Sequence, residues 1–407
     1  MSKRTILMLS SLDIKPLGNA QSTPVIQKTI AGYVDSGWDV QFLAAHPINA
    51  QRASTGICIR RVGEKLDRLR RIAYGSRIRF PLRFVWWTLF QMALVSEGMR
   101  ILRRTSIYLI YSWDAWVAPA ARALSILGGI PVVARFLGAS SMKSRMRSRN
   151  WRLACWETIL AYKARYDLTI ITDDGSQGDE IICALGGRSR RVLFWRNGVD
   201  APARISVERQ ASQRKSLNLT EEKVLLCISR LVQSKHVERS IRALSQVLEE
   251  REDVSLVVVG DGPERAKLEL EADHLAVSQH TRFVGAVPHE EVWAFLSLAD
   301  IFISTYDQTN VGNPLLEAMM ASKCIVTLNV GDTSKLVTHG VTGILLNTCE
   351  LPRLGSVLLH LLSNDGFRTE LGNAAGSYAK EHLWSWEKRI GAEIEEVEKL
   401  LSKATSR

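Results

Sequence analysis

The stretch IFISTYDQTNVGNPLLEAMMASKCIVT (residues 301–327) indicates the fold, because it joins two strand-like runs through a helix. An apolar run at 301–305 is followed by a polar loop and a glycine, Gly312. A helical pattern then starts near Pro314, a residue well tolerated in the first turn of a helix. A second apolar run follows at 324–328. Runs this apolar are typical of parallel strands that are buried on both faces.

The same alternation of apolar runs and amphipathic segments continues over most of the 407 residues. It predicts a doubly wound α/β architecture. The other expected strands are at 5–9, 39–45, 108–112, 131–136, 168–172, 191–195, 224–229, 255–260 and 282–286. The pattern breaks in a polar, basic segment, so we expect an N-terminal domain (1–198), a linker (199–222), a second domain (223–378) and C-terminal helices (379–407).

Two basic residues and two glycines follow expected strands of the second domain. Ligands of doubly wound sheets bind beyond the carboxyl ends of the strands, where a cleft between two such domains would lie. Arg230 and Lys235 follow the run 224–229 and suit a diphosphate, since Arg makes forked contacts and Lys supplies a compact charge. The alternative is an ordinary solvated loop in a chain with 53 Lys and Arg residues. Gly260 and Gly262 permit a tight turn but lack the third glycine of a dinucleotide fingerprint.

Five segments, taken in order, resemble one enzyme family. They are SRLVQSKH, VVVGDGPER, FVGAVPHEEV, the stretch quoted above and THGVTGILL. Together they are similar to the nucleotide-sugar domain of retaining family 4 glycosyltransferases over about residues 190 to 390. The resemblance implies the GT-B fold, in which two Rossmann-like domains face each other and a C-terminal helix, here WSWEKRI (384–390), crosses back.

The resemblance implies roles for the residues that match its motifs. Arg230 and Lys235 would hold the donor diphosphate and stabilise the charge of the leaving group. Glu317 would accept hydrogen bonds from the ribose hydroxyls, because a carboxylate is purely an acceptor. The remaining implied contacts are the amides of Asn310, Val311 and Gly312 with the donor sugar, Val287 near the base, and Asn197 in the junction motif WRNGVD. Neither a metal nor an organic cofactor is expected.

Three positions depart from the family pattern or match it loosely. Thr309 occupies the place of a glutamate that usually contacts the donor sugar, so Asn310 could supply side-chain contacts instead. Asp114, in YSWDAW, stands near a usual histidine and is the candidate polar group beneath the sugar, while the neighbouring tryptophans more often indicate packing. Gly18 and Asn19 lie where relatives have a glycine loop approaching the donor phosphate; the alternative is a plain strand-to-helix turn.

Charge and composition suggest an anionic partner. The net charge is +11, and residues 60–104 hold twelve basic and three acidic side chains around an aromatic, apolar run. With the basic segment 142–156, this favours peripheral contact with an anionic membrane, although the helix could instead pack inside the domain.

No nucleic-acid motif is present. The apolar run 84–96 is too short to span a bilayer. Six cysteines without CxxC spacing favour reduced thiols and hence a cytoplasmic protein, whose membrane contact would be with the inner face.

The resemblance therefore implies a retaining glycosyltransferase that moves a sugar from a nucleotide-diphosphate-sugar to a glycan or glycolipid acceptor, as in cell-surface polysaccharide assembly. Two alternatives remain. A GT-B sugar-nucleotide epimerase would need an acid/base pair, which the sequence does not identify. A non-catalytic GT-B subunit, binding a partner or a membrane, is favoured by Thr309 and Trp113.

Overall fold

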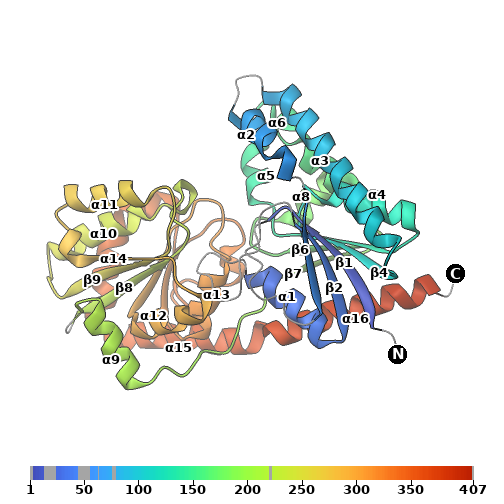
Figure 1. Ribbon diagram of the computed structural model, residues 1–407. Helices are drawn as coiled ribbons and strands as arrows, with labels where there is room; N and C mark the ends of the chain where they lie inside the picture. Colours follow the sequence, from blue (N-terminus) through green and yellow to red (C-terminus); the bar gives the residue numbers. More distant parts are fainter. Residues whose placement is uncertain are drawn as a thin grey trace. The chain divides into compact units, whose positions relative to one another are not determined.

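A computed structural model of the chain describes residues 3–12, 24–44, 56–62, 64–75, 79–219 and 222–405. The chain forms two compact units (Figure 1). Unit 1 comprises residues 1–173, 177–196 and 387–407, and unit 2 comprises 174–176 and 197–386. The segment 199–222, predicted as a linker, contains a ten-residue helix, α9 (Val207–Ser216).

Unit 1 contains a seven-stranded parallel sheet in the order β3-β2-β1-β4-β5-β6-β7. The strands are β1 (Arg4–Ser10), β2 (Trp38–Ala44), β3 (Ile57–Arg61), β4 (Ile107–Ser112), β5 (Val132–Phe136), β6 (Leu168–Thr172) and β7 (Val192–Trp195). Its helices are α1 (Pro24–Asp35), α2 (Asp67–Gly75), α3 (Arg79–Leu102), α4 (Ala118–Gly128), α5 (Ser140–Arg145), α6 (Trp151–Ala154), α7 (Trp156–Lys163), α8 (Gly178–Ala184) and α16 (Trp386–Thr405), with a short 3-10 turn η1 (Glu64–Leu66).

Helices cover both faces of the unit 1 sheet. Leu7, Leu9 and Ile110 pack with α3, α4 and α7 on one face. Strand residues alternate between faces, so Tyr111 and Arg135 point to the other side, where they contact α16 through Glu393. There α16 also lies against α1, because a Cβ built on Gly32 would stand 2.4 Å from Ile390. The last helix of the chain is thus part of the core of unit 1.

Unit 2 contains a six-stranded parallel sheet in the order β10-β9-β8-β11-β12-β13. The strands are β8 (Lys223–Ile228), β9 (Val254–Val259), β10 (Thr281–Gly285), β11 (Ile301–Ser304), β12 (Cys324–Leu328) and β13 (Ile344–Leu346). Besides α9, its helices are α10 (Glu238–Leu248), α11 (Arg265–His274), α12 (Val292–Leu298), α13 (Asn313–Met320), α14 (Leu354–Ser363) and α15 (Asp365–His382). Short 3-10 turns are η2 (Gln233–Lys235), η3 (Ser278–His280), η4 (His289–Glu291), η5 (Thr333–Lys335) and η6 (Thr348–Arg353).

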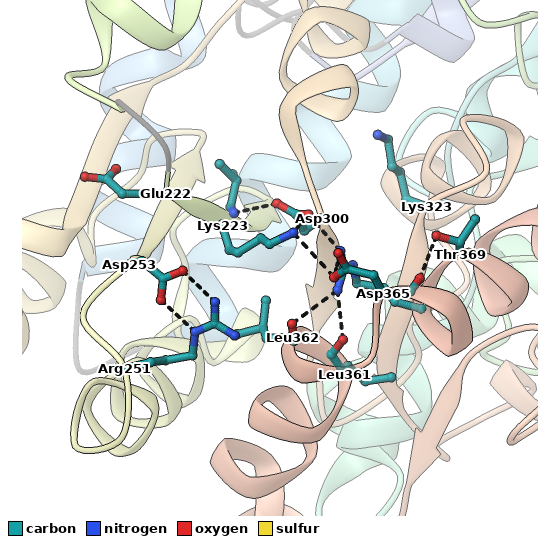
Figure 2. Close-up of polar contacts among 12 residues, drawn as sticks. Glu222, Lys223, Arg251, Asp253, Asp300, Lys323, Leu361, Leu362, Asp365 and Thr369 are labelled. Atoms are coloured by element: carbon teal, nitrogen blue, oxygen red, sulfur yellow. Dashed lines mark hydrogen bonds and ion pairs between the residues drawn. The ribbon is translucent and has the colours of Figure 1, made fainter.

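The unit 2 sheet has a hydrophobic core on each side. Leu225 and Cys227 of β8 face α10, α11 and α14, whereas Val224, Leu226 and Ile228 face α12 and α13. At the amino end of the sheet, Asp300 bonds to Lys223 and to Arg368 of α15, and Arg251 pairs with Asp253 (Figure 2). This charge network joins α15 to the amino ends of the strands. It therefore lies at the edge of the sheet opposite to the carboxyl ends.

The predicted doubly wound α/β fold is confirmed in both units. In each sheet the strand order reverses once, between β1 and β4 in unit 1 and between β8 and β11 in unit 2. Ligands of such sheets bind at this reversal, beyond the carboxyl ends of the strands. The loops that follow β8 and β11 therefore lie where a ligand of unit 2 would bind.

Candidate functional site

Lys235 lies in η2, on the loop that follows β8. Its Nζ stands 3.8 Å from the ring centre of Tyr306, on the loop that follows β11. The Tyr306 hydroxyl donates to the carbonyl of Ile228, 3.1 Å away at the end of β8. Tyr306 thus bridges the two strands beside the reversal point and places its ring beneath the ammonium group, a cation–π arrangement.

Burial lowers the pKa of Lys235 from its ordinary value, and the positive charge of Arg230 acts in the same direction. The carboxylate of Asp174 opposes this shift. Arg230 itself is exposed, directly after β8. Two mutually repelling cations, one of them desolvated, form a site that an anion would stabilise.

Gly260 and Gly262 allow the loop after β9 to pack closely against the loop after β8. A Cβ on Gly260 would lie 1.8 Å from the Ser229 carbonyl oxygen, and a Cβ on Gly262 would lie 2.3 Å from that of Leu231. Gly260 also has φ +133°, which side chains with a Cβ rarely adopt. The glycine pair therefore serves close packing of the β8 and β9 loops, next to Arg230.

The Gly260→Ala substitution is expected to destabilise unit 2 by about 2 kcal/mol or more, since strain and a backbone clash act together. The matched control is Gly366→Ala in α15, where a Cβ meets nothing closer than 3.7 Å. That variant should be neutral or stabilising. Urea unfolding of both variants checks the prediction, and equal midpoints would contradict it.

Glu317 lies in α13, with only 4% of its surface exposed. Its Oε1 is 2.7 Å from Nε2 of His289, which belongs to η4 after β10. The second oxygen, Oε2, accepts no hydrogen bond from the described residues and can accept from a ligand. Sequence reasoning missed His289, although VPHEEV contains it, because the contact joins residues 28 positions apart.

The loop between β11 and α13 is bonded to itself and to neighbouring loops. Asn310 is 2% exposed, and its side chain bonds to both backbone groups of Tyr306 and to the Leu328 carbonyl. The Thr309 hydroxyl donates to the Asp174 carbonyl at 2.5 Å. The Asn310 amide thus stabilises the loop, and its expected side-chain contact with a sugar stays a prediction that would require these bonds to open.

The three backbone amides predicted to meet the donor sugar also have partners. The N–H of Asn310 donates to the Thr333 hydroxyl, that of Val311 to the Thr309 hydroxyl, and that of Gly312 to the Asn310 carbonyl. Their contact with a sugar stays a prediction, and it requires these bonds to open or to be shared.

Asn197 and Val287 lie on other segments of unit 2. Asn197 Nδ2 donates to Oδ1 of Asn313, the first residue of α13, at 3.0 Å. Its own Oδ1 is buried and has no partner among the described residues. Val287, after β10, is half-buried against the core that includes α12. Within the described part of the chain, no hydrogen bond or ion pair joins Glu317 or Asn197 to Lys235.

The remaining candidates belong to unit 1. Asp114 accepts hydrogen bonds from the N–H groups of Ser11 at 2.7 Å and of Trp116 at 2.8 Å. Burial raises the pKa of Asp114, and these bonds oppose the shift. Its carboxylate thus fastens the ends of β1 and β4 together. Trp113 is fully buried, which agrees with the packing interpretation. Gly18 and Asn19 lie outside the described residues.

The described residues show neither a metal-binding cluster nor a membrane-spanning helix. No group of three or more His, Cys, Asp and Glu side chains there is arranged to hold a metal ion. No helix in the same part of the chain has the length and apolar character needed to cross a membrane.

Comparison with known sequences gives matches over part of the chain. Residues 208–381 match the family described as glycosyl transferases group 1. The chain is 28% identical over 195 residues to a GDP-mannose-dependent alpha-(1-6)-phosphatidylinositol monomannoside mannosyltransferase of Mycolicibacterium smegmatis, covering 46% of this chain and 50% of that protein. It is 31% identical over 188 residues to a GDP-mannose-dependent monoacylated alpha-(1-6)-phosphatidylinositol monomannoside mannosyltransferase of Corynebacterium glutamicum, covering 44% and 48%. The chain thus spans about half the length of the curated relatives it matches.

Solved structures match along nearly the whole chain. Anabaena HepE, crystallised with UDP and glucose, aligns with a TM-score of 0.73 at 17% identity, covering 97% of this chain and 99% of that one. Sucrose-phosphate synthase of Thermosynechococcus elongatus aligns with a TM-score of 0.76 at 16% identity, covering 99% and 100%. At these identities the likeness establishes the fold. The chain therefore has the GT-B fold, with a Rossmann-like sheet in each unit, and most of its second unit matches the glycosyl transferases group 1 family.

Proposed function

We propose that the protein is a retaining glycosyltransferase of family 4 that uses a nucleotide-diphosphate-sugar donor. The observation that carries the proposal is the desolvated Lys235 beside Arg230, at the reversal point of the unit 2 sheet. The two cations bind the donor diphosphate, and the free oxygen of Glu317 accepts from the ribose hydroxyls. The group 1 family match over 208–381 supports this assignment.

In the proposed reaction, the bond between the anomeric carbon and the β-phosphate oxygen breaks while the acceptor oxygen bonds to that carbon from the same face. The leaving phosphate takes the acceptor proton. Arg230 and Lys235 stabilise the negative charge that grows on the phosphate, which is often the largest contribution to catalysis. We propose no metal or organic cofactor for these steps.

The names of the relatives suggest candidate classes of donor and acceptor. Curated relatives are named for GDP-mannose and phosphatidylinositol mannosides, and the HepE structures were solved with UDP or UDP-glucose. We therefore propose a lipid-linked or glycan acceptor, and a donor that carries guanosine or uridine diphosphate.

Unit 1 has a surface that suits such an acceptor. Five apolar residues of α3 are exposed. Val85, Leu89 and Met92, spaced four and three residues apart, share one side of the helix and are here called the α3 apolar face, whereas Phe80 and Phe84 contact Trp156 of α7. α2 packs against α3 (Figure 1). α7 also packs against α3, through Trp156 and Trp87. Exposed cations on α2 and in the segment before α7 are Arg68, Arg71, Lys143, Arg145, Arg147, Arg149 and Arg152. An apolar helix face flanked by cations favours an anionic membrane surface, and we propose that the protein works at the cytoplasmic face of a membrane.

The double variant Val85→Ser/Met92→Ser is expected to bind anionic vesicles at least about tenfold more weakly, because two apolar side chains no longer enter the lipid. Sedimentation with phosphatidylglycerol vesicles measures this. Leu270→Ser, at an exposed apolar position on α11 of unit 2, is the control and should leave vesicle binding unchanged. Equal binding by all three proteins would contradict the membrane role of the α3 apolar face.

The function is tested by incubating the protein with GDP-mannose or UDP-glucose, with and without phosphatidylinositol vesicles. Release of the nucleoside diphosphate that depends on the acceptor, with the donor anomeric configuration kept in the product by NMR, is the expected result. Inversion would contradict the retaining mechanism. Donor consumed equally without acceptor would favour an epimerase, and binding without turnover would favour a non-catalytic subunit.

A further inference from the structure

Three side chains connect the segment after β8, which here includes the first turn of α10, to the loop after β11. Nε2 of His236 is 2.7 Å from Oδ2 of Asp307, and Nη1 of Arg239 is 2.7 Å from Oδ1 of the same carboxylate. Arg239 Nη1 also donates to the carbonyl of Thr305 at 2.7 Å. His236, Arg239 and Asp307 are here called the switch-point clamp, since they join the two loops at the point where the strand order reverses.

His236 adopts a backbone conformation that residues other than glycine rarely use. Its φ is +48°, in the left-handed region. Its Nδ1 lies 2.7 Å from Glu238, so both ring nitrogens face carboxylate oxygens. These two contacts hold the ring in place, so the side chain of His236 offsets the backbone strain.

The clamp adjoins Lys235 on both sides. His236 is the next residue in the chain, and Asp307 follows Tyr306, the residue whose ring lies under the Lys235 ammonium group. A change in the distance between the two loops would therefore move the ammonium group relative to that ring. We propose that the switch-point clamp positions Lys235 toward the donor diphosphate. The clamp residues act through Lys235 and need not touch the ligand themselves. This inference rests on the proposed function.

The proposal distinguishes diphosphate binding from nucleoside binding. Asp307→Ala removes the acceptor shared by His236 and Arg239 and should weaken binding of GDP or UDP about tenfold. The corresponding monophosphates, which offer less charge to Lys235, should be affected less. His236→Gly removes the same contact while permitting the positive φ, so it should reproduce the loss without backbone strain.

The decisive experiment is a double-mutant cycle by calorimetry. In a Lys235→Ala background, Asp307→Ala should have no further effect on diphosphate affinity, because the group that it positions is gone. Asp253→Ala, which breaks the pair with Arg251 at the opposite edge of the sheet (Figure 2), is the control and should bind like wild type. Equal losses for mono- and diphosphates, or an undiminished loss without Lys235, would overturn the proposal.

A readout that needs no ligand separates failure of the clamp from failure of the proposed function. The rate at which acetic anhydride acetylates Lys235, followed by mass spectrometry, reports how firmly the Lys235 amine is fixed in its site. Asp307→Ala should speed this labelling several-fold and leave Lys323, which donates to the Ser297 carbonyl at 3.2 Å, unchanged. If the wild type binds no nucleotide, the proposed function fails while faster labelling still supports the clamp. Labelling of Lys235 at the same rate in Asp307→Ala and in wild type would overturn the clamp proposal.

Discussion

Replacing Glu393 by alanine is expected to destabilise unit 1 by about 3–5 kcal/mol, because it leaves two buried guanidinium groups without their shared carboxylate. Glu393 Oε2 accepts from Arg135 at 3.0 Å and from Arg389 at 2.9 Å. Its Oε1 accepts from the Tyr111 hydroxyl at 2.7 Å. Arg135 and Glu393 are at most 1% exposed, so water cannot replace the lost bonds.

The rest of this network cannot compensate for the loss. The Arg135 guanidinium lies 4.9 Å from the Trp113 ring centre, and that of Arg389 lies 4.7 Å from the Trp195 ring centre. These contacts stabilise the two cations, but three of their nitrogens (Arg135 Nε and Nη2, and Arg389 Nη2) have no hydrogen-bond partner among the described residues. Burial, followed by the charge of Glu393, raises the pKa of Tyr111, so the hydroxyl remains a donor rather than a second anion.

Native-state hydrogen exchange on peptides from β4 and β5 measures the effect within unit 1. The control is Glu395→Ala, an exposed position on the same helix, which should change stability by less than about 0.5 kcal/mol. Similar exchange in both variants would show that Glu393 does not hold the network together. Loss of exchange protection only in the Glu393 variant would establish that it does.

The second large effect is expected for Lys235→Ala, which should lower kcat/KM by about a hundredfold to a thousandfold, the usual loss for a group that stabilises a developing oxyanion. The Lys267→Ala variant, at an exposed position on α11, is the control and should retain wild-type activity. Turnover of the Lys235 variant within a factor of about two of wild type would refute a catalytic role.

The same variant should not be less stable in the absence of ligand. Burial lowers the pKa of Lys235, so the charged amine costs folding free energy below its folded-state pKa. That cost declines as the pH rises from the folded-state pKa toward the higher unfolded-state value, since the unfolded chain then binds more protons. A variant that is more stable but less active is typical of substitutions in binding sites. Thermal unfolding of wild type and Lys235→Ala at several pH values checks this expectation.

The strands that the sequence predicted well are those with long apolar runs. The runs at 168–172 and 324–328 became β6 and β12 with the same bounds, and each of the other predicted strands differs from the observed one by a single residue at one or both ends. Two strands were missed for physical reasons. β3 has the sequence ICIRR, which lacks an apolar run, and β13 has only three residues. α9 was hidden in the expected linker because VERQASQRKS has no buried residue and no apolar stripe.

The sequence placed Arg230 and Lys235 at the carboxyl edge of the sheet, where the structure also has them, but it could not give side-chain directions. Asn310 follows β11 as a ligand-binding residue would, yet its amide turns inward to three backbone groups of its own surroundings. Asp114 is occupied by backbone N–H groups in the same way. The partnership of His289 with Glu317 depends on the packing of η4 against α13, which spacing does not reveal.

The most direct test of the central claim is ligand-induced thermal stabilisation with GDP-mannose, UDP-glucose, GDP and UDP. A ligand at one hundred times its Kd adds about 2.7 kcal/mol to stability. A clear rise in Tm is expected for wild type with ligands of one base, and a much smaller rise for Lys235→Ala. No rise with any of these nucleotides, or an equal rise in both proteins, would contradict a nucleotide-sugar site built around Lys235.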